Sequence, residues 1–111
     1  MPFEFGDVVL VPFPFTSQTT SKKRPAVVVS GRAYNAAKPD IVAMAVTSQL
    51  RASTVLGEVW LGEWKTAGLL KPSAIKPVFA TLEQALVIRQ LGTLHAADKE
   101  ALRRAIARVL A

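Results

Sequence analysis

Cysteine is absent from this 111-residue sequence, and histidine occurs only once, at His95. A chain without cysteine cannot form disulfides or thiolate metal sites, and one histidine cannot supply the imidazole pairs that many metal centres use. No glycine-rich phosphate-binding motif is present either. The sequence therefore predicts neither a metal nor a cofactor. His95 precedes a helical pattern, so we expect it in a cap or on the surface.

Long apolar runs and paired carboxylates are also missing. No run approaches the roughly 20 residues of a membrane-spanning helix, and the N-terminal segment is acidic where a signal peptide would be basic. We therefore expect a cytoplasmic protein without a membrane partner. The acidic residues are scattered, and Asp98 and Glu100 belong to the start of a predicted helix. This distribution argues against a hydrolase built on histidine or on two carboxylates.

Positive charge is in excess. The sequence contains fourteen Lys and Arg residues and eight Asp and Glu residues, which gives a formal charge of +6. Such a balance favours polyanionic partners, although it also suits a generally basic soluble surface. Lys22, Lys23 and Arg24 are adjacent and precede Pro25 and an apolar run. Folding does not require so much charge at a strand entrance, which makes this segment a candidate anion-binding site.

Short apolar segments of strand length recur along the chain. Their composition predicts strands at 6–15, 25–30, 41–49, 57–64 and 73–82. Pro12, Pro14 and Pro77 cannot donate to a sheet, so we expect them at edges or bulges. The polar residues between the second and third strands are interpreted as a connection. Residues 82–92 fit either a helix or a strand, and the pattern leaves this open.

The last segment predicts an amphipathic helix. Apolar residues follow helical spacing from Leu94 to Leu110, with acidic residues early and arginines late, which complements the helix dipole. Glu100 and Arg104 form a favourable i,i+4 pair. Short strands and one terminal helix predict a mainly β fold, a strongly bent sheet or small barrel with the helix packed against it. The composition does not break, so residues 1–111 are expected to form one domain.

Three stretches resemble the MazF/PemK family of toxins from type II toxin–antitoxin pairs. They are GDVVLVPFPFTSQTTSKKRPAVVVS, IVAMAVTSQ and FATLEQALVIRQLGTL, in the family's order and spacing. The resemblance implies an SH3-like small barrel that forms a homodimer and cleaves single-stranded RNA without metal, by attack of a 2′-hydroxyl on the adjacent phosphate. It also implies a cognate antitoxin with a disordered acidic tail, and a helical turn followed by an extended segment over residues 83–91.

By the same resemblance, Arg24 and Thr47 are the catalytic residues. A guanidinium at a strand entrance matches a phosphate with a rigid fork of donors, so Arg24 is expected to stabilise charge in the transition state. Arginine is a poor general base because it stays protonated. Thr47 would donate a neutral hydrogen bond to a non-bridging oxygen, and Ser48 is a neighbour that would share this task.

Further residues are predicted to bind RNA. Lys22 and Lys23 would attract flanking phosphates, which gives salt-dependent affinity without sequence readout. The other candidates are Gln18, Ser48, Gln49 and Lys76. Family members often carry a carboxylate in the first loop, where this chain has QTTS, and polar residues where this chain has Val78 and Ala80. Lys71 or Lys76 would then replace a lost cation.

The aromatic residues have different predicted places. Trp60 is expected in the core, whereas Trp64 and Tyr34 remain open as base-stacking residues.

Two other functions are possible for this sequence. One alternative is a non-catalytic toxin of the same fold that inhibits a protein such as a gyrase subunit. Another is a basic RNA-binding module that has lost cleavage. The pairing of Arg24 with Thr47 distinguishes the enzyme from both.

Overall fold

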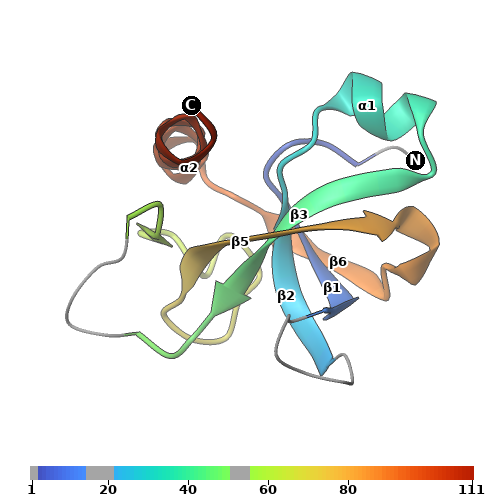
Figure 1. The fold of residues 1–111 in the computed structure, drawn as a ribbon. Helices are drawn as coiled ribbons and strands as arrows, with labels where there is room; N and C mark the ends of the chain where they lie inside the picture. The colour runs from blue at the N-terminus through green and yellow to red at the C-terminus, as the bar shows by residue number, and fades with distance from the viewer. Residues whose placement is uncertain (1–2, 15–21, 51–55) are drawn as a thin grey trace.

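A computed structural model describes residues 3–14, 22–50 and 56–111. Within these residues the chain forms strands, two α-helices and one 3-10 turn (Figure 1). In chain order they are β1 (Asp7–Phe13), β2 (Lys22–Val28), α1 (Arg32–Ala37), β3 (Asp40–Thr47), β4 (Val59–Trp60), β5 (Ala74–Glu83), the 3-10 turn η1 (Gln84–Leu86), β6 (Arg89–Thr93) and α2 (Ala96–Leu110).

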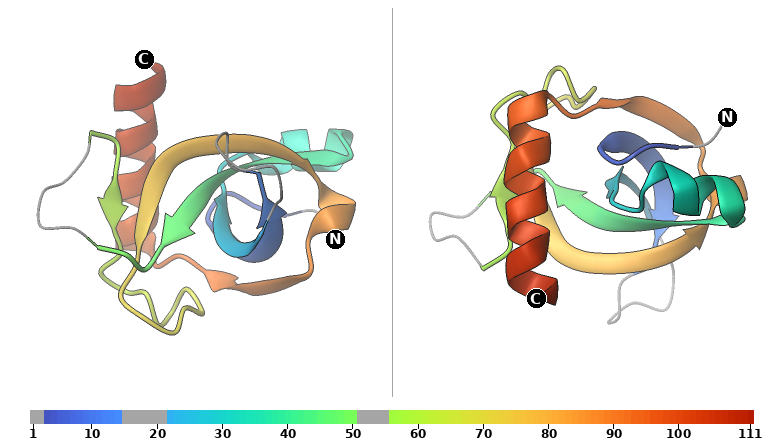
Figure 2. Two further views of the ribbon diagram at one scale, coloured as in Figure 1. Left: turned by 60° about the horizontal axis from the view of Figure 1, so that its bottom comes forward. Right: turned by 90° about the horizontal axis from the view of Figure 1, so that it is seen from above.

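The strands make one six-stranded sheet in the order β4-β5-β3-β2-β1-β6, and every neighbouring pair is antiparallel. The sheet curls into a half-barrel, and α2 stands beside it (Figure 2). The predicted mainly β architecture with a bent sheet and a C-terminal helix is therefore confirmed. None of the described helices is long and apolar enough to cross a membrane.

Both faces of the curled sheet carry a hydrophobic core. One core includes Val8 and Met44 of the sheet and Leu102 of α2, so this core joins the helix to the sheet. The other includes Val9 and Phe13 on the opposite face. Alternate residues of a strand point to opposite faces, so β1 contributes to both cores, and its nearly continuous apolar sequence follows from this.

The prolines lie where the sheet is interrupted. β6 pairs with β1 only from Asp7 to Leu10, so Pro12 stands where β1 has a partner on one side alone. In β5 the register shifts around Pro77, because Phe79 pairs with Met44 whereas Ile75 pairs with Val46. A residue without an N–H fits both positions. The predictions for Pro12 and Pro77 are confirmed.

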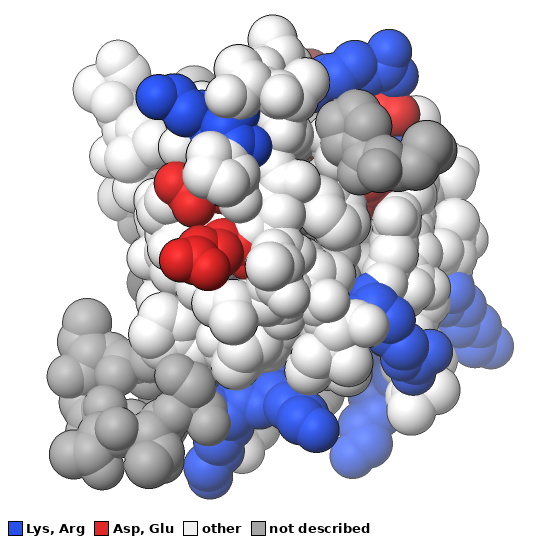
Figure 3. Space-filling model, turned by 90° about the vertical axis from the view of Figure 1, so that its right-hand side faces the viewer, with Lys and Arg blue, Asp and Glu red and all other residues white. Residues whose placement is uncertain are grey.

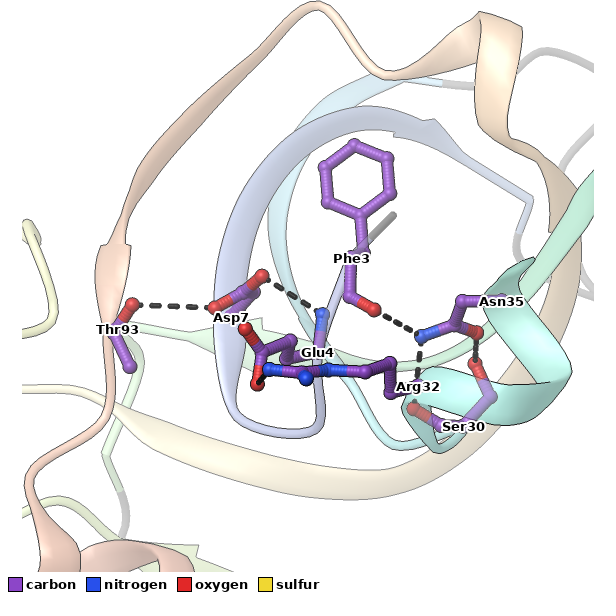
Figure 4. Close-up of polar contacts among 7 residues, drawn as sticks. All are labelled: Phe3, Glu4, Asp7, Ser30, Arg32, Asn35 and Thr93. Carbon is purple, nitrogen blue, oxygen red and sulfur yellow. Dashed lines mark hydrogen bonds and ion pairs between the residues drawn. The ribbon is translucent and has the colours of Figure 1, made fainter. Parts of the chain in front are cut away.

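Helix α1 was not predicted, because the segment was interpreted as a connection. Its centre is the buried Asn35, whose Nδ2 donates to the carbonyl oxygens of Phe3 at 2.7 Å and Ser30 at 3.1 Å. The Ser30 hydroxyl donates to Asn35 Oδ1 at 2.5 Å, and Arg32 pairs with Glu4 at 2.8 Å (Figure 4). Polar contacts therefore hold this short helix. Because it is not held by an apolar face, the sequence lacks the apolar periodicity from which a helix is predicted.

Helix α2 begins as predicted. The Ala97 N–H donates to His95 Nδ1 at 3.2 Å, so His95 is the N-cap residue. The Asp98 carboxylate in the first turn is only 7% exposed, and it accepts the N–H groups of Gly62 and Glu63 at 3.1 and 3.0 Å. Asp98 therefore ties the loop after β4 to the helix. The recorded ion pair of Glu100 is with Arg103, at 3.5 Å, instead of the expected Arg104.

The region after β3 departs most from prediction. β4 contains only two residues instead of the predicted strand over 57–64. Trp60 is 44% exposed and donates its indole N–H to Glu58 at 2.8 Å, so its placement in the core was wrong. Trp64 is partly buried against the core shared with α2. At residues 83–91, the implied helical turn and extended segment are confirmed by η1 and β6.

Candidate active site

A pocket of about 420 Å³ opens where β2 begins and β3 ends. These two strand ends lie on the lower side of the sheet in Figure 1. Three segments form its walls: the facing ends of β2 and β3, the loop before β5, and the start of β6 beside β1. The lining residues are Leu10, Arg24, Pro25, Val46, Thr47, Ser48, Gln49, Gly68, Leu69, Leu70, Lys71, Ser73, Arg89 and Leu91.

The register of the sheet explains why Arg24 and Thr47 come together. The last recorded pair between β2 and β3 is Ala26 with Ala45. Continued by two residues, this antiparallel register sets Arg24 opposite Thr47. The pairing of β2 with β3 begins at Ala26, immediately after Pro25, which has no N–H to donate. The pocket lies at the unpaired ends of the two strands, beside Arg24 and Thr47.

Local hydrogen bonding prepares the Thr47 hydroxyl to act as a donor. The backbone N–H of Gln49 donates to Thr47 Oγ1 at 3.1 Å. A hydroxyl that accepts this bond still has its own hydrogen to donate. Thr47 and Arg24 are half-buried, whereas Ser48 and Gln49 are exposed. The strand end therefore offers a positioned neutral donor beside a guanidinium at the mouth of the pocket.

The loop before β5 packs its backbone directly against β6. Gly68 has φ +83°, and a Cβ atom there would overlap the carbonyl group of Leu91. On the other side, a Cβ atom on Gly92 would lie 2.7 Å from the carbonyl group of Ala67. Two glycines thus allow a close approach that any side chain would prevent. Together with Asp98, this contact fixes the wall formed by residues 68–71.

The pocket is electropositive. Its lining contains Arg24, Lys71 and Arg89, and no Asp or Glu is among the lining residues that the structure describes. In a side view of the surface, several Lys and Arg side chains line the lower edge, and the Asp and Glu side chains in view lie above them (Figure 3). Guanidinium, ammonium and hydroxyl donors without a competing carboxylate favour a bound anion.

The predicted residues divide into three groups. Arg24, Thr47, Ser48 and Gln49 all line the pocket. The cations Lys22, Lys23 and Lys76 lie outside its lining; the first two are exposed at the start of β2, and the third is half-buried in β5. The third group is Gln18, which lies outside the described residues.

Sequence reasoning missed Arg89, which the structure adds to the lining. This residue follows the apolar Val87 and Ile88 in the segment whose pattern did not distinguish helix from strand. Lys71, considered only as a replacement cation, also lines the pocket. His95 caps α2 and is not among the lining residues. In the described parts of the chain, no three His, Cys, Asp or Glu side chains are grouped to hold a metal ion.

The fold and the pocket define a small β protein, a half-barrel with a basic, hydroxyl-bearing pocket at the open end of two strands. The chain belongs to the family of PemK-like, MazF-like toxins of type II toxin–antitoxin systems, whose model matches residues 4–110. No curated protein sequence matched the chain.

Several solved structures share this fold at low sequence identity. A mycobacterial endoribonuclease in complex with its cognate antitoxin matches with a TM-score of 0.77 and 22% identity, over 96% of this chain and 93% of that one. The Mycobacterium tuberculosis toxin MazF-mt6 matches at 0.76 and 20% identity, over 94% and 95% of the two chains. MazF from Deinococcus radiodurans matches at 0.76 and 24% identity, over 99% and 97%.

Proposed function

We propose that this protein is the toxin of a type II toxin–antitoxin pair and that it acts as a metal-independent endoribonuclease on single-stranded RNA. The main observation behind the proposal is that Arg24 and Thr47 line the same basic pocket, whose described lining has no carboxylate. Family membership and the fold shared with a mycobacterial endoribonuclease support it. Cleavage of messenger RNA would stop translation and growth.

The proposed reaction uses the RNA as its own nucleophile. The 2′-oxygen forms a bond to phosphorus and loses its proton to water. The bond from phosphorus to the 5′-oxygen breaks, and that oxygen takes up a proton from water. The products are a 2′,3′-cyclic phosphate and a 5′-hydroxyl. Arg24 stabilises the additional charge on the phosphorane, and the Thr47 hydroxyl donates to a non-bridging oxygen.

Incubation of the purified protein with a long single-stranded RNA in excess EDTA tests this function. We expect cleavage in EDTA at the same rate as without it, because the proposed chemistry uses only a guanidinium, hydroxyls and the RNA. End-group analysis should find 2′,3′-cyclic phosphates and 5′-hydroxyls. Products with 5′-phosphates would contradict the mechanism. Binding without cleavage would favour the RNA-binding module, and no binding of RNA would favour a protein target such as gyrase.

The proposed partners are a second copy of the chain and a cognate antitoxin. One of the structures of similar fold contains an endoribonuclease with its cognate antitoxin. For a chain with a formal charge of +6, we propose an antitoxin whose acidic, disordered tail orders on the toxin and covers the RNA site. Exposed charges mainly steer encounter, so added salt should slow association more than it speeds dissociation.

Charge reversal at the start of β2 tests the role of the two exposed lysines. The double variant Lys22→Glu/Lys23→Glu should weaken RNA cleavage and antitoxin binding together, because both partners are anionic. The matched control is Arg104→Glu/Arg108→Glu, which changes net charge equally on exposed residues of α2 outside the pocket lining. Cleavage rates and antitoxin association rates should be measured for both. Equal losses would mean that only net charge matters.

A further inference from the structure

Arg89 is the first residue of β6, is exposed, and lines the pocket on the side away from β3. Leu10 of β1 pairs with Pro25 on one side and with Arg89 on the other, so these three residues form one row across the sheet. Adjacent strands lie about 4.7–4.9 Å apart, which places the backbones of β2 and β6 roughly 10 Å from each other. Arg24 and Arg89 thus belong to strands on either side of β1, and both line the pocket.

Arg89 is available to a ligand. Among the described residues no carboxylate pairs with it, whereas Arg32 and Arg103 each have an acidic partner. Its guanidinium has five donors in a planar fork that suits a phosphate. Such an exposed guanidinium at the rim of a basic pocket is well placed to bind an anion.

The surface between the two arginines is apolar. Leu10 lies on β1, the strand between β2 and β6, and Leu69, Leu70 and Leu91 also line the pocket. Leu70 is 94% exposed, which makes it the most exposed large apolar side chain in the described chain. The order of cation, apolar surface and cation matches phosphate, nucleoside and phosphate along a single strand of RNA.

We propose that Arg89 binds the phosphate adjacent to the scissile one, so that RNA crosses β1 from β2 to β6. The nucleoside between the two phosphates packs on Leu10, Leu70 and Leu91. This inference rests on the proposed function, in which Arg24 and Thr47 hold the scissile phosphate. Arg89 is then a positioning residue that sets the path of the substrate, and Leu70 contributes apolar contact to the same nucleotide.

The salt dependence of binding tests this path without requiring cleavage. The probe is a short, fluorescently labelled 2′-O-methyl RNA of randomised sequence, which lacks the free 2′-hydroxyl needed for attack. Each phosphate contact of a single strand contributes about −0.7 to the slope of log K against log salt. Arg89→Ala should reduce the steepness of the slope by about 0.7, and Arg89→Lys should retain it. Leu70→Ser should lower affinity at every salt concentration and leave the slope unchanged.

Arg104→Ala is the matched control, since it removes an exposed arginine of α2 that lies outside the pocket lining. We expect the slope for this variant to equal that of the wild type. If Arg89→Ala also leaves the slope unchanged, or if both variants change it equally, the proposed path is wrong. The result is separate from the test of function: a wild-type protein that cleaves nothing would refute the nuclease, whereas an unchanged Arg89→Ala slope beside normal cleavage would refute only the path.

Discussion

Replacement of Arg24 by Ala should lower the rate of RNA cleavage by about 10²–10³, the usual cost of losing a donor that stabilises an anionic transition state. Arg24 is half-buried at the entrance of β2, outside both hydrophobic cores, so the fold should survive its loss. Single-turnover cleavage measures the rate, and circular dichroism with urea unfolding verifies the fold.

Arg24→Lys separates the shape of the donor from its charge. An ammonium keeps the positive charge but lacks the bidentate fork, so this variant should recover little of the lost rate. Arg104→Ala is the control for arginine removal, because Arg104 is exposed on α2 and does not line the pocket. An Arg24→Lys variant as active as the wild type would show that charge alone is sufficient.

Gly68→Ala should destabilise the protein by about 2–5 kcal/mol, combining about 1–2 kcal/mol for a left-handed residue with about 1–3 kcal/mol for overpacking. Gly68 has a positive φ, and the new Cβ would overlap the carbonyl group of Leu91. Relief of the overlap requires the loop to move away from β6, which also opens the pocket wall. Equilibrium unfolding in urea measures the stability.

Gly31→Ala provides the matched control. Gly31 is the N-cap of α1 with φ −78°, and a Cβ atom there would meet nothing within 4 Å. An N-cap alanine is less favourable than glycine, so we expect a loss of at most about 1 kcal/mol. A Gly68→Ala protein no less stable than Gly31→Ala would mean that the loop adapts without cost.

The sequence predicts well what depends on short-range pattern. The strand-length apolar runs and the spacing of the terminal helix follow from which faces are buried, and the prolines indicate where the ladder is interrupted. His95 as a cap also follows from its place before the helix. In the site, Arg24 and Thr47 were identified through resemblance, and the register that sets them opposite each other depends on a pairing that composition does not specify.

The errors have a common cause in long-range contacts. Helix α1 is held by hydrogen bonds from Asn35 to the distant Phe3 and from the distant Gln84 to the carbonyl oxygens of Asn35 and Lys38, and such contacts give no periodic signal in the sequence. Trp60 was expected in the core, but β4 is an edge strand of two residues and leaves it partly exposed. Arg89 reaches the pocket only through the pairing of β6 with β1.

The pairing of β1 with β6 has a consequence for synthesis on the ribosome. β1 is the first strand made, but its second neighbour contains residues 89–93, which are among the last before α2. Arg24 and Thr47 emerge early, whereas the wall that includes Leu91 and the helix that holds the loop through Asp98 emerge late. The pocket is therefore completed only after β6 and α2 have been synthesised. Under the proposed function, a nascent chain that still lacks them has no finished site with which to cleave its own messenger RNA.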